Sequence, residues 1–356
     1  MAALVVVLAA LAGTPSASAD DNGTWQHLPY QLGQGLYFPQ QELRIGGYAS
    51  IHYYDLHGQD PTLNVHDLSL FVTKQLSSRW QLFTEAEVGD ALIVSDNRFD
   101  SGDAEFDIER LYADYHARQG VTLRFGKFLT PVGQWNLIHA DPLVWSVSRP
   151  LTTSAAYARH ATGAMVYGSA TLAHNDLDYW LFADDSEQLT PSPRRDLAFN
   201  TDGASSTQQN AFSHAVGGRL LYHLLDDRLS VGASLLDFEL REPQQQYRLL
   251  GLDFSWSTQL ADFTGEAVYR TRKDTGSIDE RGGFLQAVVP LRRPLYLVGR
   301  YEQYQTAALT QTTTINTVGL NYRVRPAISL KLEYRYGSNN ALVAPDGWLS
   351  SLAVLF

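Results

Sequence analysis

Residues 330–336 read LKLEYRY, and apolar or aromatic side chains alternate with charged ones at every position. Leu330 and Leu332 fall on one side of an extended chain, whereas Lys331 and Glu333 fall on the other. Successive side chains of a β-strand point to opposite faces of the sheet. The stretch therefore predicts a strand with one apolar and one polar face.

The same period of two recurs along most of the chain. LRIGGYASIHYY at 43–54 repeats it. Further segments with this pattern are 63–76, 79–90, 105–117, 120–128, 160–170, 175–184, 211–225, 227–241, 245–257, 259–272, 281–291, 294–305, 313–324 and 346–356. We expect an all-β fold of about 16 strands. The pattern changes phase near Leu235 and Leu236, which predicts a β-bulge there.

The connections between these segments are alternately short and long. The short ones are 77–79, 118–120, 226–227, 292–294 and 324–326, and the long ones are 91–104, 129–159, 185–210, 273–280, 306–312 and 337–345. Short periplasmic turns and long external loops are typical of transmembrane, antiparallel, up-and-down β-barrels. An even number of strands places both chain ends on the periplasmic side. Among the external connections, 55–62 and 242–244 are the two interpreted as short.

The polar faces of the predicted strands carry many charges. They are Arg44, Asp67, Arg79, Glu85, Glu87, Arg110, Asp114, Arg124, Arg219, Asp253, Glu266, Arg270, Arg300, Glu302, Arg323, Lys331, Glu333 and Arg335. A dry core could not hold so many charges without large desolvation costs. A barrel of about 16 strands leaves an aqueous channel, so we expect these side chains to face a wet lumen.

Composition excludes several functional classes. The chain of 356 residues has no cysteine and a net charge of −11, so it lacks thiolate metal sites and the basic surface that nucleic acid requires. The His-Glu-x-x-His, Gly-x-x-x-x-Gly-Lys-Ser/Thr and Gly-x-Ser-x-Gly motifs are absent from it. The acid-rich stretch 100–107 lacks the spacing of a defined calcium loop and is interpreted as a solvated loop. No enzyme activity, cofactor or metal site is expected.

The N-terminal residues resemble an export signal. An apolar run from Ala2 to Ala12 precedes Gly13, Pro15 and the small-residue sequence Ala-Ser-Ala at 17–19. This order is typical of a secretory signal peptide. No apolar run reaches the ~18 residues that a membrane-spanning helix needs. We expect a signal peptide at 1–19, a periplasmic leader at 20–41 and the barrel at 42–356.

The last segment, GWLSSLAVLF at 347–356, places Trp348, Leu352, Val354 and Phe356 on one face. It resembles the closing strand of outer-membrane barrels, in which the final phenylalanine is recognised by the barrel-assembly machinery. The resemblance implies that Phe356 has this role.

A second resemblance is more specific. In the stretch from Glu105 to Asn136, the strand pattern x-Leu-Arg-x-Gly-x-Phe is followed by x-x-Pro-x-Gly, at Leu123, Arg124, Gly126, Phe128, Pro131 and Gly133. It resembles the hairpin of the phosphate-selective porin O and P superfamily. The resemblance implies a homotrimeric, sixteen-stranded channel in the outer membrane of a Gram-negative bacterium, in contact with membrane lipids and lipopolysaccharide. Its third external loop, 129–159, would fold into the lumen.

We predict a constriction between this loop and the nearby wall. The candidate residues are Glu85, Glu87, Arg110, Asp114, Arg124, Trp135, His139, Asp141, Arg149 and Arg159. The four arginines form a positive ring that favours anions, or they hold the loop through carboxylates such as Asp114 and Asp141. The phosphate specificity of the superfamily does not transfer, because the predicted lumen is of mixed charge.

Three functions are compatible with these observations. The first, which we prefer, is a passive diffusion channel for small hydrophilic solutes or ions. The second is an outer-membrane enzyme whose barrel presents a site, and the third is a barrel that encloses a redox or secretion partner contacted by residues 21–41. Conductance without hydrolysis would distinguish the first from the second.

Overall fold

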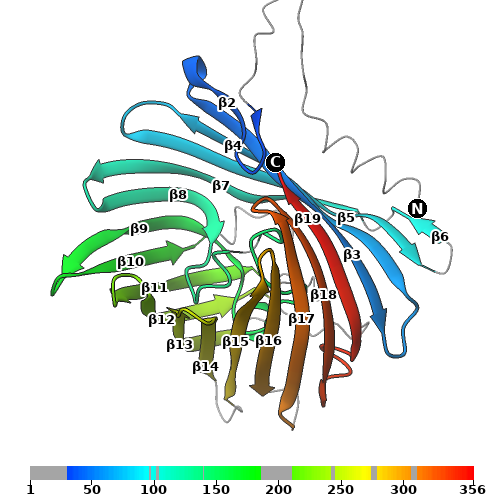
Figure 1. Ribbon diagram of the computed structural model, residues 1–356. Helices are drawn as coiled ribbons and strands as arrows, with labels where there is room; N and C mark the ends of the chain where they lie inside the picture. The colour runs from blue at the N-terminus through cyan, green and yellow to red at the C-terminus, as the bar shows by residue number, and fades with distance from the viewer. Residues whose placement is uncertain are drawn as a thin grey trace, which may run out of the picture.

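The computed structural model describes residues 30–95, 98–101, 104–138, 140–185, 211–241, 245–273, 279–305 and 311–356. Sixteen long antiparallel strands in these ranges close into a barrel (Figure 1). They are β3 (Leu43–Leu56), β4 (Thr62–Gln75), β5 (Trp80–Ser95), β7 (Glu105–Arg118), β8 (Val121–Leu129), β9 (His160–Leu172), β10 (Asn175–Asp184), β11 (Phe212–Leu224), β12 (Leu229–Leu240), β13 (Gln245–Ser257), β14 (Asp262–Arg272), β15 (Glu280–Arg292), β16 (Leu295–Gln305), β17 (Thr313–Arg325), β18 (Ile328–Ser338) and β19 (Gly347–Leu355). Each long strand pairs with its neighbours in sequence, and β19 pairs with β3 to close the sheet. The predicted barrel and its strand number are confirmed.

The remaining elements are short. They are β1 (Tyr30–Gln31), β2 (Gly35–Phe38), η1 (Pro39–Gln41), β6 (Arg98–Asp100) and α2 (Leu151–Ser154). No helix in the described ranges is long and apolar enough to cross a bilayer. The predicted signal peptide, 1–19, lies outside the described residues.

The C-terminal residue and the short strand β2 both contact the start of β3. Phe356 and Gly47 of β3 exchange two backbone hydrogen bonds of 2.8 Å each. Beside this contact, β2 pairs with the start of β3, from Leu36 opposite Ile45 to Phe38 opposite Leu43. Strands β1 and β2, at 30–31 and 35–38 of the predicted leader, are therefore part of the sheet.

The predicted faces are confirmed on β18. Leu330 and Leu332 are 43% and 46% exposed, whereas Lys331 and Glu333 are 4% and 2% exposed. In a closed barrel the buried face is the inner one, so the charges point inward and the leucines point toward lipid.

Two local predictions are wrong. Strand β12 pairs with β11 and β13 without a register shift near Leu235, so the predicted bulge is absent. Instead, Leu236, Phe238 and Leu240 face inward and are buried in an apolar cluster inside the barrel. The predicted loop 91–104 is also shorter, because β5 continues to Ser95 and β6 pairs back on it.

Candidate functional site

The segment between β8 and β9, described at residues 130–138 and 140–159, packs against residues of several barrel strands. Val132, Leu151 and Tyr157 of this segment are buried in one apolar cluster with Phe238 of β12 and Leu249 of β13. Helix α2 lies against β14, β15 and β16. Apolar residues on the inner faces of β12 and β13 are thus explained by the segment that covers them.

Backbone amides of the segment donate to glutamates of the barrel wall. Each glutamate is at most 7% exposed, and the hydrogen bonds measure 2.7–2.9 Å. The acceptors are Glu266 of β14, Glu302 of β16 and Glu333 of β18, and the donors are the amides of Gln134, Trp135, Val147, Ser148 and Leu151. A buried amide without a partner is costly, so carboxylates on the wall stabilise an otherwise irregular chain.

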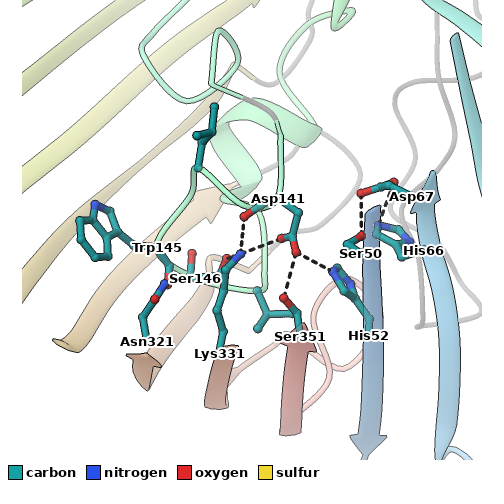
Figure 2. A network of polar contacts seen from close by, with 12 residues as sticks. Ser50, His52, His66, Asp67, Asp141, Trp145, Ser146, Asn321, Lys331 and Ser351 are labelled. Carbon is teal, nitrogen blue, oxygen red and sulfur yellow. Dashed lines mark hydrogen bonds and ion pairs between the residues drawn. The ribbon is translucent and has the colours of Figure 1, made fainter. Parts of the chain in front are cut away.

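Asp141 of the segment contacts side chains of three strands (Figure 2). Its carboxylate lies 2.8 Å from Lys331 Nζ and 3.2 Å from His52 Nε2, and it accepts a 2.9 Å hydrogen bond from Ser351 Oγ. Burial alone would raise the pKa of Asp141, but the Lys331 ammonium and His52 hold it well below its usual range. Asp141 therefore links the segment to β18, β19 and β3 as a carboxylate.

Two predicted arginines pair with carboxylates inside the wall. Arg110 Nε lies 2.5 Å from Glu85 Oε2, and Arg124 binds Asp114 through two hydrogen bonds of 2.8 Å. Both carboxylates are buried, at 0% and 2% exposure, whereas the arginine side chains are 20% and 18% exposed. Bidentate pairing fixes the guanidinium plane as well as its position.

The other predicted residues are dispersed. Glu87 accepts hydrogen bonds from Tyr48 (2.7 Å) and Ser69 on the inner wall. The Trp135 ring lies edge-on to Phe284, with ring centroids 6.3 Å apart. His139 lies outside the described residues.

Arg149 and Arg159 belong to the segment and are half-buried. The Arg159 carbonyl accepts a 2.8 Å hydrogen bond from the Thr130 amide, which joins the two ends of the segment. Burial and the neighbouring charge of Arg159 lower the pKa of Arg149 to about 10. The two guanidinium groups therefore repel each other.

The predicted residues that the structure describes thus lie in separate places, some on the wall strands and some on the segment. Arg110 and Arg124 lie with Glu85 and Asp114 on β5–β8, whereas Asp141 lies against β18, β19 and β3. Among the described residues Asp141 pairs with Lys331 and contacts the imidazole of His52, but it contacts no arginine, so its predicted role as an arginine partner is wrong. Asp114 binds Arg124 of the wall and not an arginine of the segment.

Sequence reasoning missed Glu109, His52 and His160. Glu109 is 2% exposed and its Oε2 lies 2.5 Å from Nε2 of His160. A register shift between β5 and β7 turns Glu109 inward beside Arg110. The sequence itself indicates this bulge. Adjacent residues of a regular strand point to opposite faces, so Glu109 and Arg110 can both face inward only if the strand has a bulge there, and neither charge tolerates lipid.

A closed barrel of sixteen strands with leucines outside and charges inside defines an outer-membrane channel protein. The chain belongs to the Gram-negative porin family, whose model matches residues 3–342. It is a channel of the outer membrane.

Similar proteins share this fold. The anion-selective porin from Comamonas acidovorans superposes with a TM-score of 0.59 at 14% identity, over 88% of this chain and 98% of that one. The trimer form of in-vitro folded OmpT from Vibrio cholerae gives a TM-score of 0.57 at 10% identity, over 88% and 99%. An uncharacterized protein of Aquifex aeolicus (strain VF5) is 24% identical over 349 residues, which cover 84% of this chain and 76% of that protein.

Proposed function

We propose that this porin is a passive, non-catalytic diffusion channel for small hydrophilic solutes, and that the segment 129–159 is its constriction loop. The observation that carries the proposal is the set of hydrogen bonds from segment amides to Glu266, Glu302 and Glu333 of the inner wall. A segment held against β14, β16 and β18 reduces the cross-section between that side and β5–β8. The residues opposite it then decide which solutes pass.

A modest anion preference belongs to this proposal. Arg110 and Arg124 are neutralised by adjacent carboxylates, so they contribute little long-range field. Arg149 and Arg159 add positive charge near the pore path. The selectivity of the Comamonas porin agrees with this sign.

The surroundings of the channel are also proposed. We infer a homotrimer, supported by the trimer form of the Vibrio protein, in contact with lipids and lipopolysaccharide. Phe356 is the proposed signal for the barrel-assembly machinery. Residues 1–19 are the proposed signal peptide, residues 20–41 the leader and residues 42–356 the barrel, so that N-terminal sequencing of the mature protein should begin near Asp20.

Deletion within the loop tests the constriction. Removing residues 137–147 should raise the single-channel conductance in planar bilayers. Because the deletion also removes Asp141, Lys331 should be replaced with Met in the same protein, and the full-length double variant Asp141→Ala with Lys331→Met serves as the control. Unchanged conductance in the deleted, correctly assembled barrel would place the segment outside the narrowest part of the pore.

A further inference from the structure

A row of aromatic rings crosses the inner wall on β4, β5 and β7. The ring centroids of Phe71 and Phe83 lie 6.1 Å apart, and those of Phe83 and Tyr112 lie 5.1 Å apart with an interplanar angle of 20°. Phe83 and Tyr112 are directly opposite in the β5–β7 register. All three rings are half-buried, so part of each remains accessible. Aromatic residues on an inner face are not required for contact with lipid, which calls for another explanation.

Arg110 stacks on this row. Its guanidinium carbon lies 4.7 Å from the Phe83 centroid and 5.8 Å from that of Phe71. Its Nε is held by Glu85, so the plane of the group is fixed. Within the part of the chain that the structure describes, Nη1 and Nη2 of Arg110 donate no hydrogen bond. Two parallel donors are therefore available beside accessible ring surface.

A second stack continues the row onto β8 and β9. The Arg124 guanidinium carbon lies 3.6 Å from the Tyr112 centroid and 4.8 Å from that of Tyr167. Gly126 is directly opposite Tyr112 in the β7–β8 register. A Cβ atom at 126 would lie 2.9 Å from the Cα atom of Tyr112, so the close approach of the two strands depends on this glycine. Tyr112 and Tyr167 also pack against the apolar cluster that residues 130–159 help to build, so the row borders the proposed constriction.

The charges of this surface decide which solutes it suits. Each guanidinium is compensated by a carboxylate in contact, so a small inorganic anion gains little Coulomb energy. The two remaining donors of Arg110 match the two oxygens of a carboxylate. The adjacent rings favour a flat apolar body over a hydrated one.

We infer that Phe71, Phe83, Tyr112 and Tyr167, with Arg110 and Arg124, form a binding track for aromatic carboxylates on their way through the channel. The carboxylate binds the terminal nitrogens of Arg110 and the ring of the solute stacks along the row. This inference rests on the proposed function, because it names the class of solute that the channel favours.

Titration calorimetry of the purified, detergent-solubilised barrel with benzoate tests the track. We expect saturable binding of benzoate. Binding of acetate, which lacks the aromatic ring, and of benzyl alcohol, which lacks the carboxylate, should each be at least about tenfold weaker. Arg110→Lys keeps the charge but loses the planar fork and should weaken benzoate binding about tenfold. Phe83→Leu should weaken it about threefold to tenfold.

Matched variants provide the controls. Arg118→Lys at the exposed end of β7 and Phe125→Leu on the lipid side of β8, where Phe125 is 47% exposed, should bind benzoate as the wild type does. Acetate bound as tightly as benzoate, or wild-type affinity in both Arg110→Lys and Phe83→Leu, would overturn the track. Planar-bilayer conductance separates the two proposals: a conducting barrel without benzoate binding refutes the track alone, whereas benzoate binding by a barrel that does not conduct refutes the channel alone.

Discussion

At the scale of single residues, the buried ion pair between Asp141 and Lys331 fixes the position of the segment more than it adds to the free energy of unfolding. The two side chains are 8% and 1% exposed, so both lose most of their hydration. Such pairs gain little net free energy over apolar replacements, but breaking one is costly. The pair is well placed to keep the segment in one position.

Replacing one partner should therefore destabilise the protein more than replacing both. Asp141→Ala leaves the Lys331 ammonium buried and should lower the free energy of unfolding by about 3–5 kcal/mol. The double variant Asp141→Ala with Lys331→Met should recover most of this loss. Urea unfolding followed by circular dichroism measures both values. Equal losses in the single and double variants would mean that the ammonium is solvated in the folded protein.

The pH dependence of this pair has a defined sign. Because the pKa of folded Asp141 is well below the ordinary value of about 3.9, its stabilising contribution is complete above that value. The contribution is lost only as pH falls through the folded pKa. The difference in unfolding free energy between the wild type and Asp141→Asn should be constant from pH 7 to about pH 5 and decrease below pH 4. A difference that changed around pH 6 would instead implicate His52.

At the scale of elements, the β7–β8 hairpin shows what a motif can specify. Gly126 has φ of +129°, and a Cβ atom there would lie 2.1 Å from the Leu111 carbonyl oxygen. Glycine is thus required by backbone conformation and by close approach. The glycine in the quoted motif was visible in the sequence, but its direct opposition to Tyr112 emerged only from the register.

Gly126→Ala should lower the free energy of unfolding by about 1–3 kcal/mol and weaken the Arg124–Tyr112 stack. Gly299→Ala on β16 is the matched control, because a Cβ atom there meets nothing within 4 Å. Thermal unfolding of the two variants compares them directly. If both variants unfold at the same temperature, the strain argument at Gly126 does not hold.

Strand β18 permits a test of the lipid-facing side. Leu332→Arg should cost about 2–4 kcal/mol if the residue lies near the bilayer midplane, whereas Leu332→Met should cost less than about 1.5 kcal/mol. Ser329 has the inward parity but is only 1% exposed, so an arginine there would be crowded and would not serve as a neutral comparison. Folding into lipid vesicles at increasing urea gives the values. An arginine tolerated as well as methionine would mean that Leu332 is outside the hydrocarbon layer.

Alternation predicted the strands because lipid requires an apolar outer face wherever the barrel spans the membrane. It failed on β12, where the inner face is apolar as well. Leu236 and Phe238 pack on residues of the 130–159 segment, which lies far from β12 in sequence. A local pattern contains no information about such a partner.

At the scale of the whole molecule, the contacts of the candidate site could not be predicted from local sequence patterns for the same reason. The inward charges Glu266, Glu302 and Glu333 were predictable from strand parity, but their bonds to the segment span 131–186 residues of sequence. Lys331 was likewise predicted inward, and its partner Asp141 lies 190 residues away. The alternation along a strand predicts which side of the wall a residue faces. The partner of an inward-facing residue depends on where the segment lies, which the alternation does not predict.

Replacement of Arg124 tests whether ions move close to the β7–β8 part of the wall. The Arg124–Asp114 pair is neutral as a unit, so Arg124→Gln leaves one uncompensated carboxylate beside the proposed constriction. A single charge in a narrow pore is screened less than one on an open surface. The variant should therefore shift the reversal potential in a KCl gradient toward that of a cation-selective pore, with a cation-to-anion permeability ratio changed by about twofold or more. The double variant Arg124→Gln with Asp114→Asn restores neutrality and should return the reversal potential close to that of the wild type. A shift that persists in the double variant would indicate a change of pore shape and not of charge, and the absence of any shift in the single variant would place the ion path away from Arg124.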